Sequence, residues 1–351
     1  MELSYNIHNL LKIKVISYSS SLDDLDREFA YFKHADLDDP DITLNIGNFK
    51  PCITNCYVVD YKYYVKDNYI YYEDSEGKVK WKIEVSGFED GKTTINLFNS
   101  VKGAQRILNP NFLAKDLLLR FIEYKLEKVR HYLIHSAGVS RNREAYLLVG
   151  RGNSLKTTLT IDLIRRGKFN FLGDDHVIIN YSGDILSFPE NLHILEYILE
   201  NLETENSWSL ADKIKFAYNI FVRKRKVVKH DLMEIDESPK LKAILLILRK
   251  KSRDVYIREL SREETVRRIV ANNLMDDFIS PQKLNVSNGL YLKCILAYSY
   301  VFPRSKIARF HESFKKGLEN ILKSVQTYEV EMPEKYQFDT FKKIESFLNT
   351  L

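Results

Sequence analysis

The sequence predicts a mixed α/β protein with a β-rich N-terminal region, an α/β core and a helical C-terminal part. Short aromatic and β-branched runs separated by turn residues dominate the first part of the chain. Strand–helix–strand patterning follows, and helical spacing of apolar residues prevails near the end. We therefore expect a β-rich domain (residues 1–105), a connecting helix (106–130), an α/β core (131–260) and a helical part closing on that core (261–351).

Four segments predict strands in the N-terminal region. Residues 57–59, 61–65 and 68–72 are rich in Tyr and Val, and residues 78–85 alternate polar with apolar side chains. The Asp-Ser-Glu-Gly run at residues 74–77 predicts a turn between two of these strands.

Helices and strands then alternate along the rest of the chain. Residues 111–130 predict an amphipathic helix, and residues 156–166 predict a helix that ends at Gly167. The remaining expected strands are residues 132–134, 145–149, 169–173, 177–180, 242–248 and 328–331, and the remaining expected helices are residues 262–273 and 305–324.

Composition and charge favour an ordinary globular protein of the cytoplasm. The 351 residues are 44% hydrophobic and 29% charged, and the net charge of +5 is small for a dedicated nucleic-acid binder. The purest apolar run, residues 243–248, is far too short to span a membrane, so we expect no membrane partner. The first residues lack a secretion signal pattern, and the three cysteines Cys52, Cys56 and Cys294 cannot form a disulfide framework.

One segment carries a motif for binding phosphate. It lies between an apolar strand and an amphipathic helix, the setting that a phosphate-binding loop requires. Small residues let backbone N–H groups approach phosphate oxygens, and the following helix adds its positive end. Lys156 is expected to contact the β- and γ-phosphates, and Thr157 to bind Mg²⁺. The predicted nucleotide-binding residues are Gly150, Arg151, Gly152, Asn153, Ser154, Leu155, Lys156, Thr157 and Thr158.

Leu155 stands where the strict phosphate-loop pattern has glycine, immediately before the lysine. A leucine adds bulk at this point and does not readily adopt positive φ. The cost is small if the position has negative φ, and otherwise the loop must deform. The alternative for this segment is a glycine-bearing strand–turn–helix that binds no ligand.

Asp174 and Asp175 follow the next expected strand. Only one helix and one strand separate them from Lys156. A right-handed crossover makes the two strands neighbours or near neighbours, and it brings the loop and both carboxylates to the same edge of the sheet. Adjacent carboxylates repel each other, and Mg²⁺ bound with a nucleotide would compensate their charge. An exposed Asp-Asp turn is the alternative.

His135 ends the strand expected at residues 132–134. A histidine at a strand end is often structural, but this strand end falls at the edge where ligands bind in such sheets. We therefore consider both a structural role and contact with the site.

These segments resemble the catalytic domain of the HPr kinase/phosphorylase family and its relatives. The clear resemblance covers residues 135–189: His-Ser-Ala-Gly-Val at 135–139, the loop at 150–158, Arg-Gly at 166–167 and Gly-Asp-Asp-His-Val at 173–177. A looser similarity continues through residues 241–273 to 325–332. The nucleotide site of this family is also similar to that of phosphoenolpyruvate carboxykinase. The resemblance implies a P-loop core of the HPr kinase/PEP carboxykinase-like type.

The resemblance also implies an ATP-dependent kinase that uses Mg²⁺ and transfers the γ-phosphate to a hydroxyl. By matching positions, Lys156 would bind the phosphates, and Thr157 with Asp175 would hold Mg²⁺. Asp174 would take the proton from the attacking hydroxyl, and His135 would lie beside the transferred phosphate. Relatives of this kind often assemble, which implies a homo-oligomer.

The acceptor is expected to differ from that of the HPr enzymes. No segment like Glu-x-Arg-Gly-Leu-Gly follows the Asp-Asp strand, and the N-terminal region does not match their sensor domain. We therefore expect an acceptor hydroxyl on a serine of another protein or peptide, or on a small molecule. The sequence does not distinguish ATP from GTP or pyrophosphate.

Two alternatives to a kinase stay open at this point. A nucleotide-binding regulator without catalysis is favoured by Leu155. A nucleic-acid-directed enzyme or binding protein is favoured by the mild positive charge and by basic clusters at residues 223–226 and 229–230. Charge runs are usually solvated, and no aromatic stacking pattern accompanies these clusters, so nucleic acid is the less favoured partner.

Overall fold

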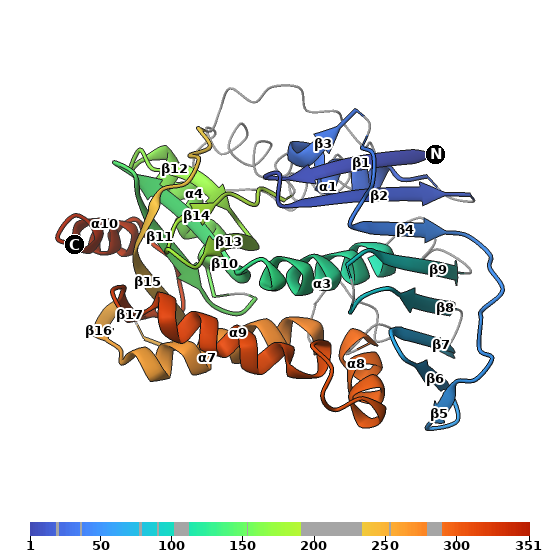
Figure 1. Cartoon of the computed structure of the whole chain (residues 1–351). Coiled ribbons are helices and arrows are strands. Elements are labelled where there is room, and N and C mark those ends of the chain that lie inside the picture. Colours follow the sequence, from blue (N-terminus) through green and yellow to red (C-terminus); the bar gives the residue numbers. More distant parts are fainter. Residues whose placement is uncertain are drawn as a thin grey trace. The chain divides into compact units, whose positions relative to one another are not determined.

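The computed structural model describes residues 1–18, 21–35, 37–76, 79–89, 91–101, 112–152, 154–190, 234–252, 254–278 and 290–351. The chain forms two compact units, each built from several separate segments (Figure 1). Unit 1 comprises Met1–Ile134, Ile179–Ser182 and Arg262–Ser324. Unit 2 comprises His135–Ile178, Gly183–Ser261 and Val325–Leu351. The fold is thus mixed α/β, as the sequence predicts, and it contains two mixed sheets.

Unit 1 contains a nine-stranded sheet in the order β3-β1-β2-β4-β9-β8-β7-β6-β5. The strands β2, β4 and β9 are parallel neighbours, and the other pairs are antiparallel. The strands are β1 (Glu2–Ile7), β2 (Leu11–Ser17), β3 (Lys33–His34), β4 (Ile42–Ile46), β5 (Tyr57–Val59), β6 (Tyr63–Lys66), β7 (Tyr69–Glu76), β8 (Val79–Ser86) and β9 (Thr93–Val101).

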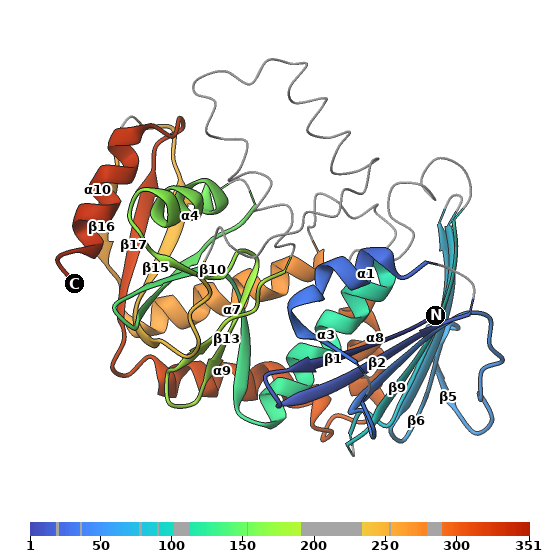
Figure 2. The same cartoon turned by 90° about the horizontal axis from the view of Figure 1, so that it is seen from above.

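Helices cover the apolar face of this sheet. In β4, for example, Ile42, Leu44 and Ile46 are fully or almost fully buried, whereas Thr43 and Asn45 on the other face are partly exposed. The helices α3 and α8 lie against the sheet on one side (Figure 2). The helices of unit 1 are α1 (Asp23–Glu28), η1 (Ala30–Phe32), α3 (Phe112–Lys128), α7 (Arg262–Phe278), α8 (Leu290–Val301), η3 (Ile307–Arg309) and α9 (Phe310–Ile321).

Unit 2 is built on an eight-stranded sheet in the order β14-β13-β10-β11-β15-β17-β16, with β12 also paired to β10. The strands β11, β15 and β17 run parallel, and β10 is antiparallel to both β11 and β12. The strands are β10 (His131–Arg141), β11 (Glu144–Val149), β12 (Asn170–Gly173), β13 (His176–Asn180), β14 (Ile185–Leu186), β15 (Lys240–Arg249), β16 (Tyr256–Glu259) and β17 (Gln326–Met332). The unit boundary falls within β10 and β13.

Two helices, α4 (Lys156–Arg165) and α10 (Phe338–Leu348), pack on one face of the unit 2 sheet. Both helices are amphipathic, and their apolar residues join alternate residues of β10, β11, β15 and β17 in one core. The core residues are Ala137, Val139, Tyr146, Leu148, Leu159, Leu163, Phe169, Ala243, Leu245, Ile247, Val330, Met332, Phe341, Ile344 and Leu348. This packing fixes the start of α4 at the edge where β11 and β15 end.

Several expected elements need correction. Residues 74–76 of the expected turn belong to β7 instead, because Asp74 pairs with Trp81 and the strand continues to Glu76, whereas Gly77 lies outside the described residues. The helix expected at residues 305–324 is shorter and begins as the 3₁₀ turn η3 before α9. His135 does not end a strand, because β10 continues through it to Arg141.

The compact units group the chain differently from the four ranges expected from composition. Residues 262–324 are part of unit 1, together with the N-terminal sheet, whereas residues 325–351 supply a strand and a helix to unit 2. The helical C-terminal part is therefore shared between the two units. No helix within the described ranges combines the length and apolar character needed to cross a membrane.

Candidate functional site

The loop at residues 150–155 connects β11 to α4, as the motif requires. Gly150 is the first residue after β11, and a Cβ atom there would lie 2.7 Å from the carbonyl oxygen of Ile247 on β15. It would also lie 3.0 Å from the Ser154 hydroxyl. Only glycine therefore lets the loop pass this close to the neighbouring strand. The Ser154 hydroxyl is buried and has no hydrogen-bond partner among the described residues.

Leu155 stands where the phosphate-loop pattern has glycine, and its backbone adopts the left-handed conformation that glycine tolerates best. Its φ is +73° and its ψ is 17°, immediately before the first residue of α4. This conformation costs a residue with a side chain about 1–2 kcal/mol. The Leu155 side chain packs against the core of unit 2, and this burial offsets part of the strain.

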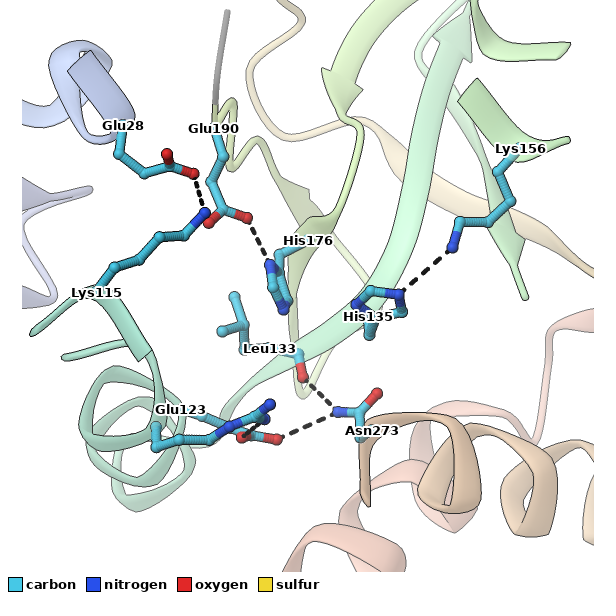
Figure 3. A network of polar contacts seen from close by, with 10 residues as sticks. Glu28, Lys115, Glu123, Leu133, His135, Lys156, His176, Glu190 and Asn273 are labelled. Atoms are coloured by element: carbon cyan, nitrogen blue, oxygen red, sulfur yellow. Dashed lines mark hydrogen bonds and ion pairs between the residues drawn. The ribbon is translucent and has the colours of Figure 1, made fainter. Parts of the chain in front are cut away.

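Lys156 is the first residue of α4, and its side chain turns back over the loop. It is 7% exposed, and its Nζ donates a hydrogen bond to the carbonyl oxygen of Gly150. The same Nζ lies 3.4 Å from Nε2 of His135 (Figure 3). His135 reaches this position because the next residue of β10, Ser136, pairs with Val149 at the end of β11. His135 therefore lies beside the loop, inside a strand rather than at its end.

Asp174 and Asp175 form a bend that joins β12 to β13. Both short strands pair with β10, and the bend at the two aspartates separates one strand from the other. The loop follows β11 and the bend follows β12, and these two parallel strands are separated only by β10. They are thus near neighbours, as expected for strands joined through a single helix. The Thr157 hydroxyl donates to Oδ2 of Asp174 at 3.2 Å.

The two carboxylates differ in their surroundings. Asp175 is exposed, whereas Asp174 is half-buried and its Oδ1 has no hydrogen-bond partner within the described part of the chain. Burial, followed by the charge of Asp175, raises the pKa of Asp174 to about 7. Of the two carboxylates, Asp174 is the one that accepts the hydrogen bond of the Thr157 hydroxyl.

The donor atoms at this edge suit a magnesium ion held jointly with phosphate. Thr157, Asp174 and Asp175 offer oxygen atoms, the ligands that Mg²⁺ prefers. Within the described ranges, no group of three or more His, Cys, Asp or Glu side chains is arranged to hold a metal. Since Mg²⁺ commonly takes one or two carboxylates plus phosphate and water, the arrangement fits a cation brought with a nucleotide.

The remaining residues of the motif are less enclosed. Arg151 and Thr157 are half-buried, and Gly152 and Thr158 are exposed. Asn153 lies outside the described residues, as do the basic clusters at residues 223–226 and 229–230.

Sequence reasoning missed His176 and Glu190. His176 Nδ1 lies 2.5 Å from Oε2 of Glu190, and both side chains are buried. They meet because residues 187–190 run beside β12, where the Phe188 N–H donates to the Leu172 carbonyl at 2.8 Å. No periodicity links positions 176 and 190. The one available signal was the position of a histidine directly after the paired aspartates.

Comparison with known proteins adds little to this geometry. No family model matches the chain, and no curated protein matches it. Among solved structures, the chain is similar to the Hpr(Ser) kinase/phosphatase from Coxiella burnetii, with 10% sequence identity and a TM-score of 0.24. The match covers 62% of this chain and 94% of that one. The relation to that fold is weak, so the functional assignment depends on the residues of the site.

Proposed function

We propose that this protein is an ATP-dependent kinase that transfers the γ-phosphate of ATP to a hydroxyl group. The observation that supports it best is the convergence of three groups at one sheet edge. Lys156 begins α4, Thr157 follows it, and the Thr157 hydroxyl bonds to Asp174. Phosphoryl transfer depends on a cation at the phosphates, a hydroxyl for the metal and a carboxylate near the nucleophile.

In the proposed function, the loop and the start of α4 bind the nucleotide. The Lys156 ammonium donates to the Gly150 carbonyl in this structure and would exchange that oxygen for phosphate oxygens when a nucleotide binds. The buried Ser154 hydroxyl supplies one further donor. The first N–H groups of α4 and its positive end favour the triphosphate at the same place.

Thr157 and Asp175 would hold Mg²⁺, as the family resemblance implies. When bound, Mg²⁺ neutralises charge on the β- and γ-phosphate oxygens. The exposed carboxylate of Asp175 is accessible for this role. The contact between Thr157 and Asp174 leaves open an exchange of the two aspartate roles, which a magnesium titration resolves.

Asp174 would act as the general base. A pKa raised to about 7 gives its carboxylate the proton affinity that suits a base near neutral pH. Asp174 accepts the proton of the acceptor hydroxyl as that oxygen forms a bond to the γ-phosphorus. The bond from the γ-phosphorus to the bridging oxygen breaks, and ADP leaves with the electron pair.

The test uses the purified full chain with Mg–ATP. The kinase proposal expects slow, magnesium-dependent ATP hydrolysis or autophosphorylation, because water or a serine of the chain substitutes for the acceptor. Lys156→Ala should abolish this turnover. Tight nucleotide binding with no turnover under any magnesium concentration would refute the kinase and favour a nucleotide-binding regulator.

The regulator is the second candidate because of Leu155. Its left-handed conformation carries strain at the point where the backbone would meet phosphate. A loop strained in this way can bind a nucleotide without holding the γ-phosphate in line for transfer. Nucleotide release rates and the absence of a phosphorylated product would identify this case.

A further inference from the structure

The buried pair of His176 and Glu190 has no role in the proposed reaction, yet it lies beside the residues that do. Glu190 is 3% exposed and His176 is 8% exposed. Their contact of 2.5 Å joins a carboxylate oxygen to Nδ1 of the ring (Figure 3). Burying a carboxylate is costly unless hydrogen bonds or an opposite charge compensate it. The contact with His176 provides such compensation for the buried Glu190 carboxylate.

The position of Glu190 is set by the backbone around it. The Phe188 N–H bonds to the carbonyl of Leu172 on β12, and the Glu190 N–H bonds to the Phe188 carbonyl at 3.0 Å. Phe188 is fully buried, and Pro189 restricts the backbone between it and Glu190. The carboxylate therefore approaches His176 from a well-anchored segment.

His176 in turn contacts His135. The two rings meet edge to face, with centroids 5.3 Å apart and planes at 81°. His135 then reaches Lys156, whose Nζ lies 3.4 Å from its Nε2. A continuous series of contacts thus runs from Glu190 through two histidines to the lysine at the phosphate loop (Figure 3).

Donor and acceptor chemistry defines the state of each ring in this series. A lysine ammonium only donates, so Nε2 of His135 accepts from it and the ring proton sits on Nδ1. A carboxylate only accepts, so Nδ1 of His176 carries a proton toward Glu190. Orientation of one imidazole by a carboxylate is a common way to fix a ring that supports a reactive group.

We propose that Glu190 and His176 are positioning residues, which hold the His135 imidazole in the orientation that presents Nε2 to Lys156. This proposal builds on the proposed function, in which Lys156 binds the phosphates and His135 lies beside the transferred group. Glu190 sets the His176 ring, and the His176 ring limits the rotation of His135.

The experiment compares ¹⁵N signals of the imidazole nitrogens in the histidine-labelled full chain. Wild type, Glu190→Gln and the buried control Glu329→Gln are measured without nucleotide, and His135→Ala assigns the His135 signals. Glu329 on β17 is 4% exposed and pairs with Arg258 on β16, near the opposite end of the strand order, and its variant makes the same charge change. Glu190→Gln should alter the signals of both His176 and His135, and Glu329→Gln neither.

Turnover provides the second measurement. Glu190→Gln should lower the rate of ATP turnover about 10- to 100-fold, the cost of a misplaced group near a reacting centre. Its dissociation constant for Mg–ATP should stay within about twofold of wild type. In a His135→Ala background, the same substitution should change turnover by less than about twofold, because its effect passes through His135.

A second variant tests the proposal in case Glu190→Gln does not fold. His176→Phe/Glu190→Leu replaces the buried pair with apolar groups and keeps a ring beside His135, a kind of exchange that proteins often tolerate. Its His135 signals should also differ from wild type. Unchanged His135 signals in both variants would overturn the proposal, since the pair would then be purely structural. If wild type binds no Mg–ATP, the proposed function fails, whereas the ¹⁵N signals still decide the positioning role.

Discussion

At the residue scale, the proposed function makes triphosphate binding depend on the charge of Lys156. Lys156→Ala should weaken Mg–ATP binding about 10- to 100-fold, because a charged hydrogen bond is worth roughly 1.5–3 kcal/mol. Isothermal titration calorimetry measures the change. Lys343→Ala is the matched control, since this exposed lysine of α10 bonds to Asp254 on the surface of unit 2. Equal affinity for wild type and Lys156→Ala would count decisively against the site.

The two adjacent aspartates are expected to do different work. Asp174→Asn keeps the shape but accepts a proton poorly, so it should bind Mg–ATP while losing about 10²–10⁴ in turnover. Asp175→Asn should weaken Mg²⁺ binding, and extra magnesium should partly restore its turnover. A magnesium titration of both variants at saturating ATP checks this. Rescue of Asp174→Asn instead would exchange the two roles, as its contact with Thr157 allows.

The raised pKa of Asp174 also predicts how stability depends on pH. In the folded protein the raised pKa of this carboxyl keeps it protonated up to about pH 7, whereas in the unfolded chain it ionises near its ordinary pKa of 3.8. The folded state therefore binds more protons between these values, and the Asp174 contribution to stability falls as pH rises from about 4 to 7.

Asp174→Asn should remove this contribution. Thermal unfolding in EDTA at pH 5 and pH 8 compares the variant with wild type. The midpoint of Asp174→Asn relative to wild type should be higher at pH 8 than at pH 5. The same difference at both values would show that burial does not raise the pKa of Asp174 in solution.

At the scale of elements, the junction of the loop with α4 combines strain and packing in one residue. Leu155→Gly should relieve the left-handed strain and leave Mg–ATP affinity equal or improved. Leu155→Ala keeps the strain and loses the packing, so it should be less stable than the glycine variant by about 1 kcal/mol. Chemical denaturation and calorimetry give both quantities. A large loss of affinity in Leu155→Gly would make the leucine an adapted part of the pocket.

Local patterns predicted most of the elements that carry the site. The apolar run ending at Val149, the spacing of α4 and its end before Gly167 are encoded within a few residues of each element. The contact of Thr157 with Asp174 agrees with the expectation that one helix and one strand bring the loop and the paired aspartates to the same edge of the sheet.

Features set by distant pairing were not predictable. Asp74 looks like a turn residue, but it accepts a hydrogen bond from the Tyr72 hydroxyl at 2.5 Å and pairs with Trp81 on the neighbouring strand. The pair of His176 and Glu190 depends on the return of residues 187–190 beside β12, which no local pattern encodes.

At the scale of the whole molecule, each unit is assembled from segments that are separated along the chain. In unit 2, β17 lies between β15 and β16 although residues 262–324 of unit 1 intervene in the sequence. Composition changes locate the ends of such segments, but they do not reveal which sheet each segment enters. The four ranges expected from the sequence therefore stay a prediction of domains and do not say which sheet each segment enters.

Removal of residues 325–351 should therefore abolish nucleotide binding, although the site residues lie elsewhere. The deletion removes β17 from the interior of the sheet and takes Val330, Met332, Phe341, Ile344 and Leu348 from the core. Circular dichroism and calorimetry of the truncated chain check this. A synthetic peptide of residues 325–351 added in trans should restore binding. Full affinity in the truncated chain without the peptide would show that unit 2 folds without this strand.

The placement of β17 also has a consequence for synthesis of the protein. A ribosome adds about 5–20 residues per second, so the roughly 80 residues from the end of β15 to the end of β17 take roughly 4–16 s. During that interval the loop and both aspartates have already been synthesised, while β15 still lacks its neighbour β17. The nascent chain should then be unable to consume ATP, and the open, apolar edge of β15 should make it a substrate for chaperones.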